Sequence, residues 1–429
     1  MAQASIFEQI LDPANRANPY PLYAQLRKTP VARQPDGTYV VSTYQEIVAL
    51  LHDHRVSSDP RSHPELAGAT PEPEEGLPGL PLDFIRRDPP EHDRLRELAT
   101  RPFGPPHTPG RIEGMRPWLT EITNDLIDKL AGRHRVDLVD DFAYPLPVTA
   151  ICRLLGVPLE DQPRFHQWAD AITTETADPS TGTFAERQRR RAQINAELGA
   201  YLNELADAHA RQPGDDLISG LLTATGPHAP MSRADLLSTC ALLLVAGHET
   251  TVNLIANGML TLLRHPDVLD RLRHEPELII PLVEELLRYE PPVQMLTGRS
   301  TLADIDIAGT TIPQCSPIVL MLASGSRDPA RFPDPDRFVP DRTDNVHLGY
   351  GSGIHYCYGA PLARVETQVA LSALARRLVH PLLVNDPPPY RSSPTLRGPR
   401  HLPVDVNAVA PAADAAVGAH DRHTVSASK

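Results

Sequence analysis

A single cysteine, Cys357, stands in a glycine-rich segment that leads into a helical pattern. The segment runs Gly351-Ser-Gly353-Ile-His355-Tyr-Cys357-Tyr-Gly359. Glycines permit a tight turn around the sulfur, and amides at a helix N-terminus stabilise a thiolate. Such a sulfur is suited to one axial bond to a haem iron. The residues alone leave two alternatives open: a buried, inert cysteine, or a nucleophile that uses the nearby His355 as its base.

Local helix preferences are broken together inside the longest helical pattern of the chain, in the sequence Ala246-Gly-His-Glu-Thr-Thr251. Glycine at such a position costs ~1 kcal/mol relative to alanine, and a buried acid or hydroxyl must find a partner or water. A helix that opens at Ala246 would leave carbonyl groups free for water or dioxygen, and Glu249 and Thr250 could then transfer protons. With equal weight, Glu249 could instead face solvent on an amphipathic helix.

Two charged pairs are weaker signals. Glu285 and Arg288 are three residues apart on a predicted helix, a spacing that is common at protein surfaces. His92 and Arg96 are four residues apart, so they share a helix face and could both bind an anion. For the second pair, a solvated helix face is the commoner explanation of the same spacing.

Helical periodicity dominates the chain from about residue 91 to 266. Its clearest part begins at Ser232, which with Asp235 forms a capping-box-like start, and ends at Arg264. At about 1.5 Å per residue this helix spans roughly 50 Å, which is enough to cross a whole domain.

The patterns outside this helical region predict smaller elements. Helices are expected at 278–289 and from about 360 to 378, and alternating or β-branched residues within 305–322 predict a small sheet. Residues 57–90 are rich in Pro, Gly and Glu and predict a long loop. The stretch 407–429 is rich in alanine and aperiodic, so we expect a frayed tail there.

The composition limits the classes of function. The formal net charge of the 429 residues is −13, which argues against nucleic acid as the main partner. None of the three lysines (Lys28, Lys129 and Lys429) follows a glycine, so a Walker-type phosphate loop is excluded. The four cysteines include no CxxC pair, so neither a zinc knuckle nor an iron–sulfur cluster is expected. Few cysteines, no basic signal region and no apolar run of ~20 residues favour a cytoplasmic protein without a membrane anchor.

Taken together, these motifs resemble those of one family. The cysteine segment is similar to the cytochrome P450 pattern F-G-x-G-x-H-x-C-x-G-x-x-L-A-R at every place but the first, where Tyr350 stands. The central motif resembles A-G-x-E-T-T, and Glu285-x-x-Arg288 resembles E-x-x-R. All of them occur in the family's order and spacing. The chain therefore resembles a bacterial cytochrome P450 from about Asp12 to Val406.

The resemblance implies a fold and a haem site. The fold would be mainly α with a minor β part, in one domain over 1–406, with haem b between the long central helix and the cysteine-loop helix. Cys357 would be the iron ligand, and its electron donation favours O–O cleavage. Glu249 and Thr250 would manage proton delivery to bound oxygen. The other residues expected to contact the cofactor are His92, Arg96, Ala246, Gly247, Arg299, Tyr350, Gly351, His355 and Gly359.

Within that set the implied roles differ. Ala246 and Gly247 would form the oxygen groove, whereas the histidines and arginines would hold the haem propionates. Glu285 and Arg288 would be structural, locked to the segment that precedes the haem loop through Arg337. The tyrosine in place of the usual phenylalanine adds a hydroxyl that must be satisfied or point away.

The resemblance also implies a substrate pocket. Its walls would come from the 57–90 loop, residues near 165–185, the long helix at Leu243–His248, and the segments 292–297 and 394–396. His248 either adds a polar contact or points at another helix. The side chains expected to line the pocket are Leu243, His248, Val293, Met295 and Leu296.

The implied activity is a monooxygenase that inserts one oxygen atom of O2 into a small, largely hydrophobic molecule. The chain has no flavin or nicotinamide loop, so electrons would come from a ferredoxin and its reductase, docked on a basic patch of Arg364, Arg376 and Arg377. A cytoplasmic monomer is expected. Three alternatives remain: a haem-thiolate enzyme with an atypical outcome (phenol coupling, desaturation or peroxide-driven oxidation), a non-catalytic haem or ligand-binding protein, and a cysteine hydrolase.

Overall fold

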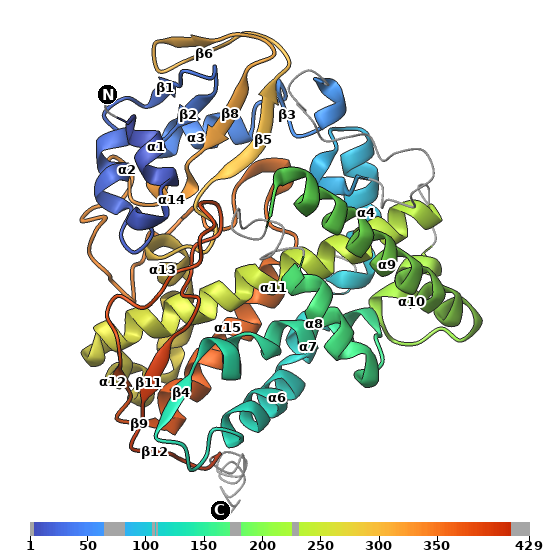
Figure 1. The fold of residues 1–429 in the computed structure, drawn as a ribbon, viewed down its shortest axis with the longest axis vertical. Coiled ribbons are helices and arrows are strands. Elements are labelled where there is room, and N and C mark those ends of the chain that lie inside the picture. Colours follow the sequence, from blue (N-terminus) through green and yellow to red (C-terminus); the bar gives the residue numbers. More distant parts are fainter. Residues whose placement is uncertain are drawn as a thin grey trace, which may run out of the picture.

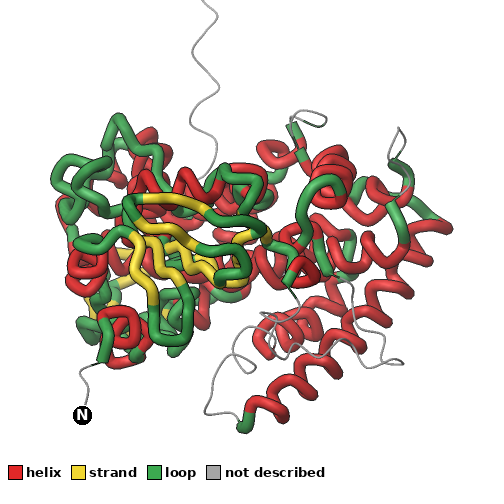
Figure 2. Tube along the Cα trace, turned by 90° about the horizontal axis from the view of Figure 1, so that it is seen from above, coloured by secondary structure: helices red, strands yellow, loops and turns green. Residues whose placement is uncertain are grey.

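The strands gather on one side of the molecule, and helices fill the rest (Figure 1; Figure 2 shows the same division from above). The computed structural model describes residues 4–63, 82–104, 108, 110–171, 182–224 and 231–412. It is 54% helical with 11% strand, so the expectation of a mainly α protein with a minor β part is confirmed.

Fifteen α-helices lie in the described part of the chain. They are α1 (Ile6–Leu11), α2 (Tyr20–Leu26), α3 (Tyr44–Leu51), α4 (Glu91–Phe103), α5 (Arg111–Gly114), α6 (Arg116–Asp128), α7 (Pro145–Leu155), α8 (Gln162–Asp170), α9 (Phe184–Arg211), α10 (Leu217–Leu222), α11 (Arg233–Arg264), α12 (Pro266–His274), α13 (Ile279–Tyr289), α14 (Leu322–Gly325) and α15 (Ala360–Arg377). A π-helical turn at Val139–Ala143 precedes α7, and a 3-10 turn at Gly353–His355 precedes Cys357.

The described strands form one larger sheet and three small ones. The larger sheet has the order β1-β2-β8-β5-β3, in which only β2 and β8 run parallel. Its strands are β1 (Val31–Arg33), β2 (Tyr39–Val41), β3 (Val56–Ser57), β5 (Leu296–Thr301) and β8 (Pro317–Leu320). The small sheets pair β6 (Ile305–Ile307) with β7 (Thr310–Ile312), β9 (Leu378–Val379) with β12 (Ala408–Val409), and β11 (Pro403–Asp405) with β4 (Arg135–Asp137) and β10 (Leu382–Leu383).

Helix α11 is the central element, as the sequence predicts. The Ser232 side chain accepts a hydrogen bond from the Asp235 amide and begins the helix, which ends at Arg264. α11 packs against α7, α9, α13 and α15, and Figure 1 shows it crossing the molecule beside α15. It is long and apolar enough to span a membrane, but 72% of its most apolar window is buried inside the protein. That burial is what a core helix of a folded domain requires.

A glycine brings α11 close to its neighbours. A Cβ atom on Gly258 would lie 2.9 Å from a methyl group of Leu371 on α15 and 3.1 Å from one of Leu286 on α13. A side chain at position 258 would therefore require the Leu371 and Leu286 side chains to move. The glycine lets α11 pack closely against these two leucines.

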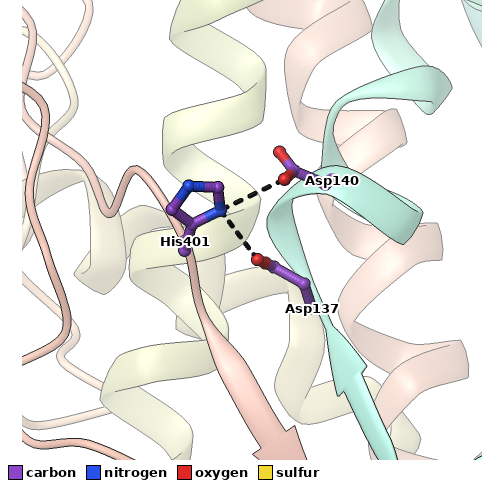
Figure 3. A group of neighbouring side chains, drawn as sticks. All are labelled: Asp137, Asp140 and His401. Carbon is purple, nitrogen blue, oxygen red and sulfur yellow. Dashed lines mark hydrogen bonds and ion pairs between the residues drawn. The ribbon is translucent and has the colours of Figure 1, made fainter.

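The C-terminal segment is bound to the helical part by ion pairs and strand pairing. His401 Nδ1 lies 2.9 Å from an Asp137 oxygen and 3.1 Å from an Asp140 oxygen (Figure 3). The other Asp137 oxygen accepts hydrogen bonds from the amides of Val139 and Leu402. These contacts join the start of β11 to the end of β4.

The expected frayed tail from residue 407 is wrong for its first residues. Ala408–Val409 forms β12, which pairs with β9, and the Ala410 amide donates to the Arg377 carbonyl. β9 directly follows α15 and offers unpaired backbone groups, so the short strand forms despite its alanine-rich sequence. Residues 413–429 lie outside the described part of the chain.

A buried ion pair fixes the segment that precedes the cysteine loop. Glu285 and Arg288 on α13 are both 0% exposed, with nitrogen and oxygen 2.8 Å apart. The Arg288 guanidinium also donates to the carbonyls of Ser326, Pro335 and Arg337. The predicted structural role of the pair and its link to Arg337 therefore agree with the geometry.

The carboxylate of this pair is equally well satisfied. Glu285 accepts hydrogen bonds from the Val339 amide, the Arg342 guanidinium and the Asn345 side-chain amide. Two buried charges are tolerated here because their remaining hydrogen-bonding groups are matched by partners.

We expect Glu285→Gln to lower the free energy of unfolding by about 3–5 kcal/mol, because it leaves the buried Arg288 charge uncompensated. Urea unfolding followed by circular dichroism measures the loss. Glu277→Gln, at an exposed position just before α13, is the matched control and should change stability by less than about 0.5 kcal/mol. Equal stability of the two variants would contradict a stabilising role for the Glu285–Arg288 ion pair.

Candidate active site

The Cys357 sulfur lies where backbone amides converge on it. Cys357 sits between the 3-10 turn and α15, and its own amide donates to the Tyr350 carbonyl at 2.9 Å. Burial raises the pKa of the thiol above its ordinary value, and hydrogen bonds from the Gly359 and Ala360 amides and the charge of Arg96 offset only part of this rise. The sulfur is therefore partly desolvated and surrounded by donors, an arrangement that suits a thiolate bound to a metal cation.

Two glycines give the loop its path. Gly351 and Gly353 have φ angles of +69° and +71°, in the left-handed region that side chains disfavour. A Cβ atom on Gly353 would lie 2.2 Å from the Leu51 carbonyl oxygen at the end of α3. The glycine spacing that singled out this segment in the sequence thus has a backbone cause.

Four basic side chains from three parts of the chain gather beside the cysteine loop. They are His92 and Arg96 on α4, Arg299 on β5 and His355 in the loop. The rings of His92 and His355 are 4.4 Å apart, and Arg96 donates to the Tyr356 carbonyl at 2.6 Å. The sequence predicted each of these residues as a cofactor contact, and the structure brings them together.

In three residues of this cluster, one side-chain nitrogen has a hydrogen-bond partner and another has none among the described residues. His92 Nδ1 pairs with Asp93 at 2.8 Å, and His355 Nε2 pairs with Ser58 at 3.0 Å. His92 Nε2, Arg96 Nη1 and His355 Nδ1 are buried and have no hydrogen-bond partner among the described residues. Buried polar nitrogens without partners cost free energy. Arg96 Nη1, and each of the two ring nitrogens when it carries a proton, can donate to an anion with several oxygen atoms.

The electrostatics of the cluster favour the same ligand. Burial lowers the pKa values of Arg96 and Arg299. Burial and the charges of Arg299, His92 and Arg96 lower the pKa of His355 to about 3. The two arginines keep their charge, and two desolvated cations this close together are stable only when an anion compensates them. Carboxylate groups of a haem have the required charge and geometry.

The central motif of α11 presents one face away from the packed core. Ala246 is exposed and Thr250 is half-buried, whereas Glu249 and Thr251 are buried. The Thr250 hydroxyl donates to the Ala246 carbonyl at 2.7 Å. α11 is unbroken here, so the helix opening considered from the sequence is absent, and the Ala246 carbonyl is already bonded to Thr250. Glu249 does not face solvent, which removes the amphipathic alternative.

Two of the expected pocket residues point elsewhere. The ring of His248 lies edge-on against Tyr144, with ring centroids 4.5 Å apart. His248 therefore contacts the start of α7, as expected if it points at another helix and not into the pocket. Met295 is 1% exposed and packs with Ile10 and Tyr23 in the core beneath the N-terminal helices. Each side chain has only 1% of its surface exposed, so these contacts do not support a place for Met295 or His248 in the pocket wall. The sequence alone does not show whether an apolar residue such as Met295, shortly after Pro291-Pro292, faces the pocket or the core.

The remaining pocket residues keep positions consistent with their assignment. Leu243 is buried within the helical core, Val293 forms a β-bridge with Leu396, and Leu296 begins β5. The bridge joins two of the predicted wall segments. Residues 64–81 and 172–181, about half of the other two predicted walls, lie outside the described part of the chain.

Tyr350 stands in the cofactor loop with its hydroxyl buried. Burial raises the pKa of Tyr350 well above its usual value, and the hydroxyl has no hydrogen-bond partner among the described residues. The Arg364 guanidinium lies 4.6 Å from the ring centroid. The Tyr350 hydroxyl, which the usual phenylalanine lacks, therefore has no hydrogen-bond partner among the described residues and is not exposed to water.

The sequence did not reveal a second acid, Glu284, that holds this loop. Its carboxylate accepts bonds from Arg364 at 2.7 and 2.9 Å and from His347 at 3.1 Å. These contacts tie α13 to α15 and to the residues just before Tyr350. The adjacent pair Glu284-Glu285 was the available signal, because two neighbouring acids on one helix must face different partners.

The predicted basic patch is wrong in its composition. Arg377 is 4% exposed and bonds to Asp128 and the Asn124 carbonyl on α6. The charge of Arg364 is matched by Glu284. Of the three arginines, only Arg376 is exposed. Helical periodicity places residues 376 and 377 on different faces, which the sequence interpretation overlooked.

Comparison with known proteins decides the family. A family model described as "Cytochrome P450" matches residues 35–399. The chain belongs to the cytochrome P450 family. It is a cytochrome P450 monooxygenase that uses haem b, and the residues around Cys357 fit that group by their donors and charges.

Relatives and solved structures agree over nearly the whole chain. The chain is 40% identical to the monooxygenase PikC of Streptomyces venezuelae, covering 90% of this chain and 91% of that protein. It is 39% identical to the mycinamicin IV hydroxylase/epoxidase of Micromonospora griseorubida, covering 89% and 94%. A myxobacterial cytochrome P450 in complex with myristic acid aligns with a TM-score of 0.83 at 39% identity, covering 93% and 99%. The chain is thus related to bacterial cytochrome P450 proteins that include a monooxygenase and a hydroxylase/epoxidase.

The Glu284 contacts predict a pH dependence of stability. Burial alone would raise the pKa of Glu284, but hydrogen bonds from Arg364 and His347 outweigh it and lower the pKa to about 2. A carboxyl whose pKa is lower in the folded state stabilises the protein above its unfolded value of about 4.5 and loses that contribution as the pH falls towards about 2.

We therefore expect Glu284→Gln to be less stable at pH 7, with a difference from the parent protein that shrinks below about pH 4.5. Urea unfolding at stepped pH values measures this difference. Glu121→Gln, at an exposed position of α6, serves as the control. A difference that stays constant down to the acid limit of the native state would contradict the assigned contacts.

Proposed function

We propose that this protein inserts one oxygen atom of O2 into a small, largely hydrophobic organic molecule by hydroxylation or epoxidation. The observation that carries the proposal is the amide-surrounded sulfur of Cys357 next to a cluster of arginines and histidines with buried, unpartnered nitrogens. A cysteine hydrolase needs neither feature. A non-catalytic haem protein has no use for the acid and the hydroxyl that α11 carries at positions 249 and 250.

In this proposal Cys357 is the axial ligand of the haem iron. His92, Arg96, Arg299 and His355 hold the propionates, for which the unpartnered nitrogens of this cluster supply donors. His355 can donate from Nδ1 as a neutral ring when the Ser58 hydroxyl donates to its Nε2. Gly351, Gly359 and Tyr350 surround the ligand loop. When bound, haem supplies the binding and activation of O2.

Thr250 and Glu249 manage protons in this proposal, and Ala246 and Gly247 border the oxygen groove. Because the Thr250 hydroxyl donates to the Ala246 carbonyl, its lone pairs stay available to accept a hydrogen bond from a bound water. Glu249 is 5% exposed, so any proton that it holds is shielded from bulk solvent. The pair can therefore order a water and pass it a proton.

An apolar substrate agrees with the residues and with the relatives. Leu243, Val293 and Leu296 present aliphatic side chains. Related structures hold myristic acid or corticosterone, and a relative is a vitamin D(3) 25-hydroxylase. Each of these molecules is largely hydrocarbon. We expect the substrate to bury most of its surface in an apolar pocket with few polar contacts.

Electrons come from a separate ferredoxin and its reductase in this proposal. The sequence shows no flavin-binding or nicotinamide-binding loop. We place the protein in the cytoplasm as a monomer with no nucleic acid or membrane partner. Turnover in the presence of ferredoxin, reductase and NAD(P)H, and none when either protein is omitted, would support this part of the proposal. Equal turnover with peroxide alone would favour the peroxide-driven alternative.

The experiment that tests the reaction is a screen of apolar molecules by the spin-state shift of the haem, followed by product analysis under ¹⁸O₂. The proposal predicts one labelled oxygen atom in the product. Phenol coupling or desaturation would yield a product without label and would refute oxygen insertion.

We expect Thr250→Ala to separate oxygen consumption from product formation, because the ordered water loses its hydroxyl partner. The fraction of consumed O2 recovered as product should fall by about tenfold, with the remainder appearing as peroxide. Thr250→Ser keeps the hydroxyl and is the matched control. Unchanged coupling in the alanine variant would remove Thr250 from the mechanism.

A further inference from the structure

A second cysteine, Cys315, forms a close pair with a histidine outside the haem site. Cys315 Sγ lies 2.7 Å from His63 Nδ1, and His63 Nε2 lies 3.1 Å from the Thr301 carbonyl oxygen. His63 is 7% exposed and Cys315 is partly exposed. The pair connects the turn between β7 and β8 to the segment after β3, beside the end of β5 (Figure 1 labels β3, β5 and β8 side by side).

The Thr301 carbonyl sets the tautomer of the histidine. A carbonyl oxygen can only accept a hydrogen bond, so His63 Nε2 must carry the proton. In a neutral ring Nδ1 is then an acceptor, and the Cys315 thiol becomes its donor. Moving this one proton along the sulfur–nitrogen contact gives a thiolate beside an imidazolium, the arrangement that activates cysteine nucleophiles.

The backbone holds the sulfur in this position. Cys315 has a φ angle of +61°, a conformation that only a few per cent of non-glycine residues adopt. Its amide donates to the Thr301 carbonyl at 2.8 Å, and the Ser316 amide donates to the Thr301 hydroxyl at 3.0 Å. That hydroxyl in turn donates to the Pro313 carbonyl at 2.6 Å. Several hydrogen bonds thus fix the turn to one residue of β5, and they hold the strained cysteine against His63.

The other cysteines lack this setting. Cys152 and Cys240 are 0% exposed within the helical core, and burial raises the pKa of each thiol to about 12. Cys357 is committed to the iron by the family assignment. Cys315 is therefore distinguished from all three by a histidine nitrogen at its sulfur, and from Cys152 and Cys240 also by its partial exposure.

We propose that Cys315, activated by His63, is a modification site that reacts with hydrogen peroxide and with other small electrophiles. In the reaction with peroxide the thiolate attacks one peroxide oxygen, an S–O bond forms and the O–O bond breaks. The sulfur is oxidised to a sulfenic acid, and the departing hydroxide takes the imidazolium proton to become water. The inserted oxygen cannot fit within the 2.7 Å contact, so the link between His63 and the turn is lost.

The alkylation rate of each cysteine in the haem-loaded protein tests the activation. Iodoacetamide at pH 7 is followed by peptide mass spectrometry, and Cys315 should react about tenfold faster than the same cysteine in the urea-unfolded chain. His63→Gln retains an N–H for the Thr301 carbonyl but provides no base, and it should slow labelling of native Cys315 by about tenfold. Cys152 and Cys240 are internal controls that stay unlabelled in the native protein.

Several results would overturn the proposal. A native Cys315 that reacts no faster than in the unfolded chain would refute the activation, and this comparison does not depend on whether the variant folds. An unchanged rate in a haem-loaded His63→Gln protein would do the same. After stoichiometric peroxide, dimedone should label Cys315 and no residue in the Cys315→Ser variant; absence of the adduct would refute peroxide as the reagent.

Discussion

Hydrogen bonds from backbone amides to the Cys357 sulfur are the interaction on which the rest of the site depends. A thiolate is unstable in a partly buried position unless donors or a cation compensate its charge. The amides of Gly359 and Ala360 supply that compensation at the start of α15, and the iron would complete it. The tight glycine turn, the close approach of the loop to α3 and the position of α15 all serve to keep these amides directed at the sulfur.

Two adjacent carboxylates on α13 hold the cysteine loop in place. Glu285 binds Arg288, which donates hydrogen bonds to the segment before the loop. Glu284 binds Arg364 on the helix that follows the loop. Because the two acids are adjacent on α13, that helix fixes both ends of the loop at once. The pair therefore acts at the site without contacting substrate or oxygen.

Sequence patterns predicted the elements whose local signals agree with their packing. The cap at Ser232 and the bounds of α11 follow from capping and periodicity. The structural role of Glu285 and Arg288 was implied by the family resemblance, because their spacing alone is common at protein surfaces. The sequence was a poor guide where a contact depends on distant residues. Met295 packs beneath the N-terminal helices because a neighbouring strand fixes its face, Arg377 binds α6, and no pattern in the sequence brings His63 to Cys315.

The central claim is that one sulfur of this chain is bonded to a haem iron as thiolate. Chemical reduction of the purified protein followed by carbon monoxide tests it directly, with Cys357→Ser as the matched variant. The account predicts the strongly red-shifted absorption band of thiolate-ligated haem in the parent protein and its absence in the variant. A colourless protein, or a reduced carbon monoxide complex without that shift, would contradict the account.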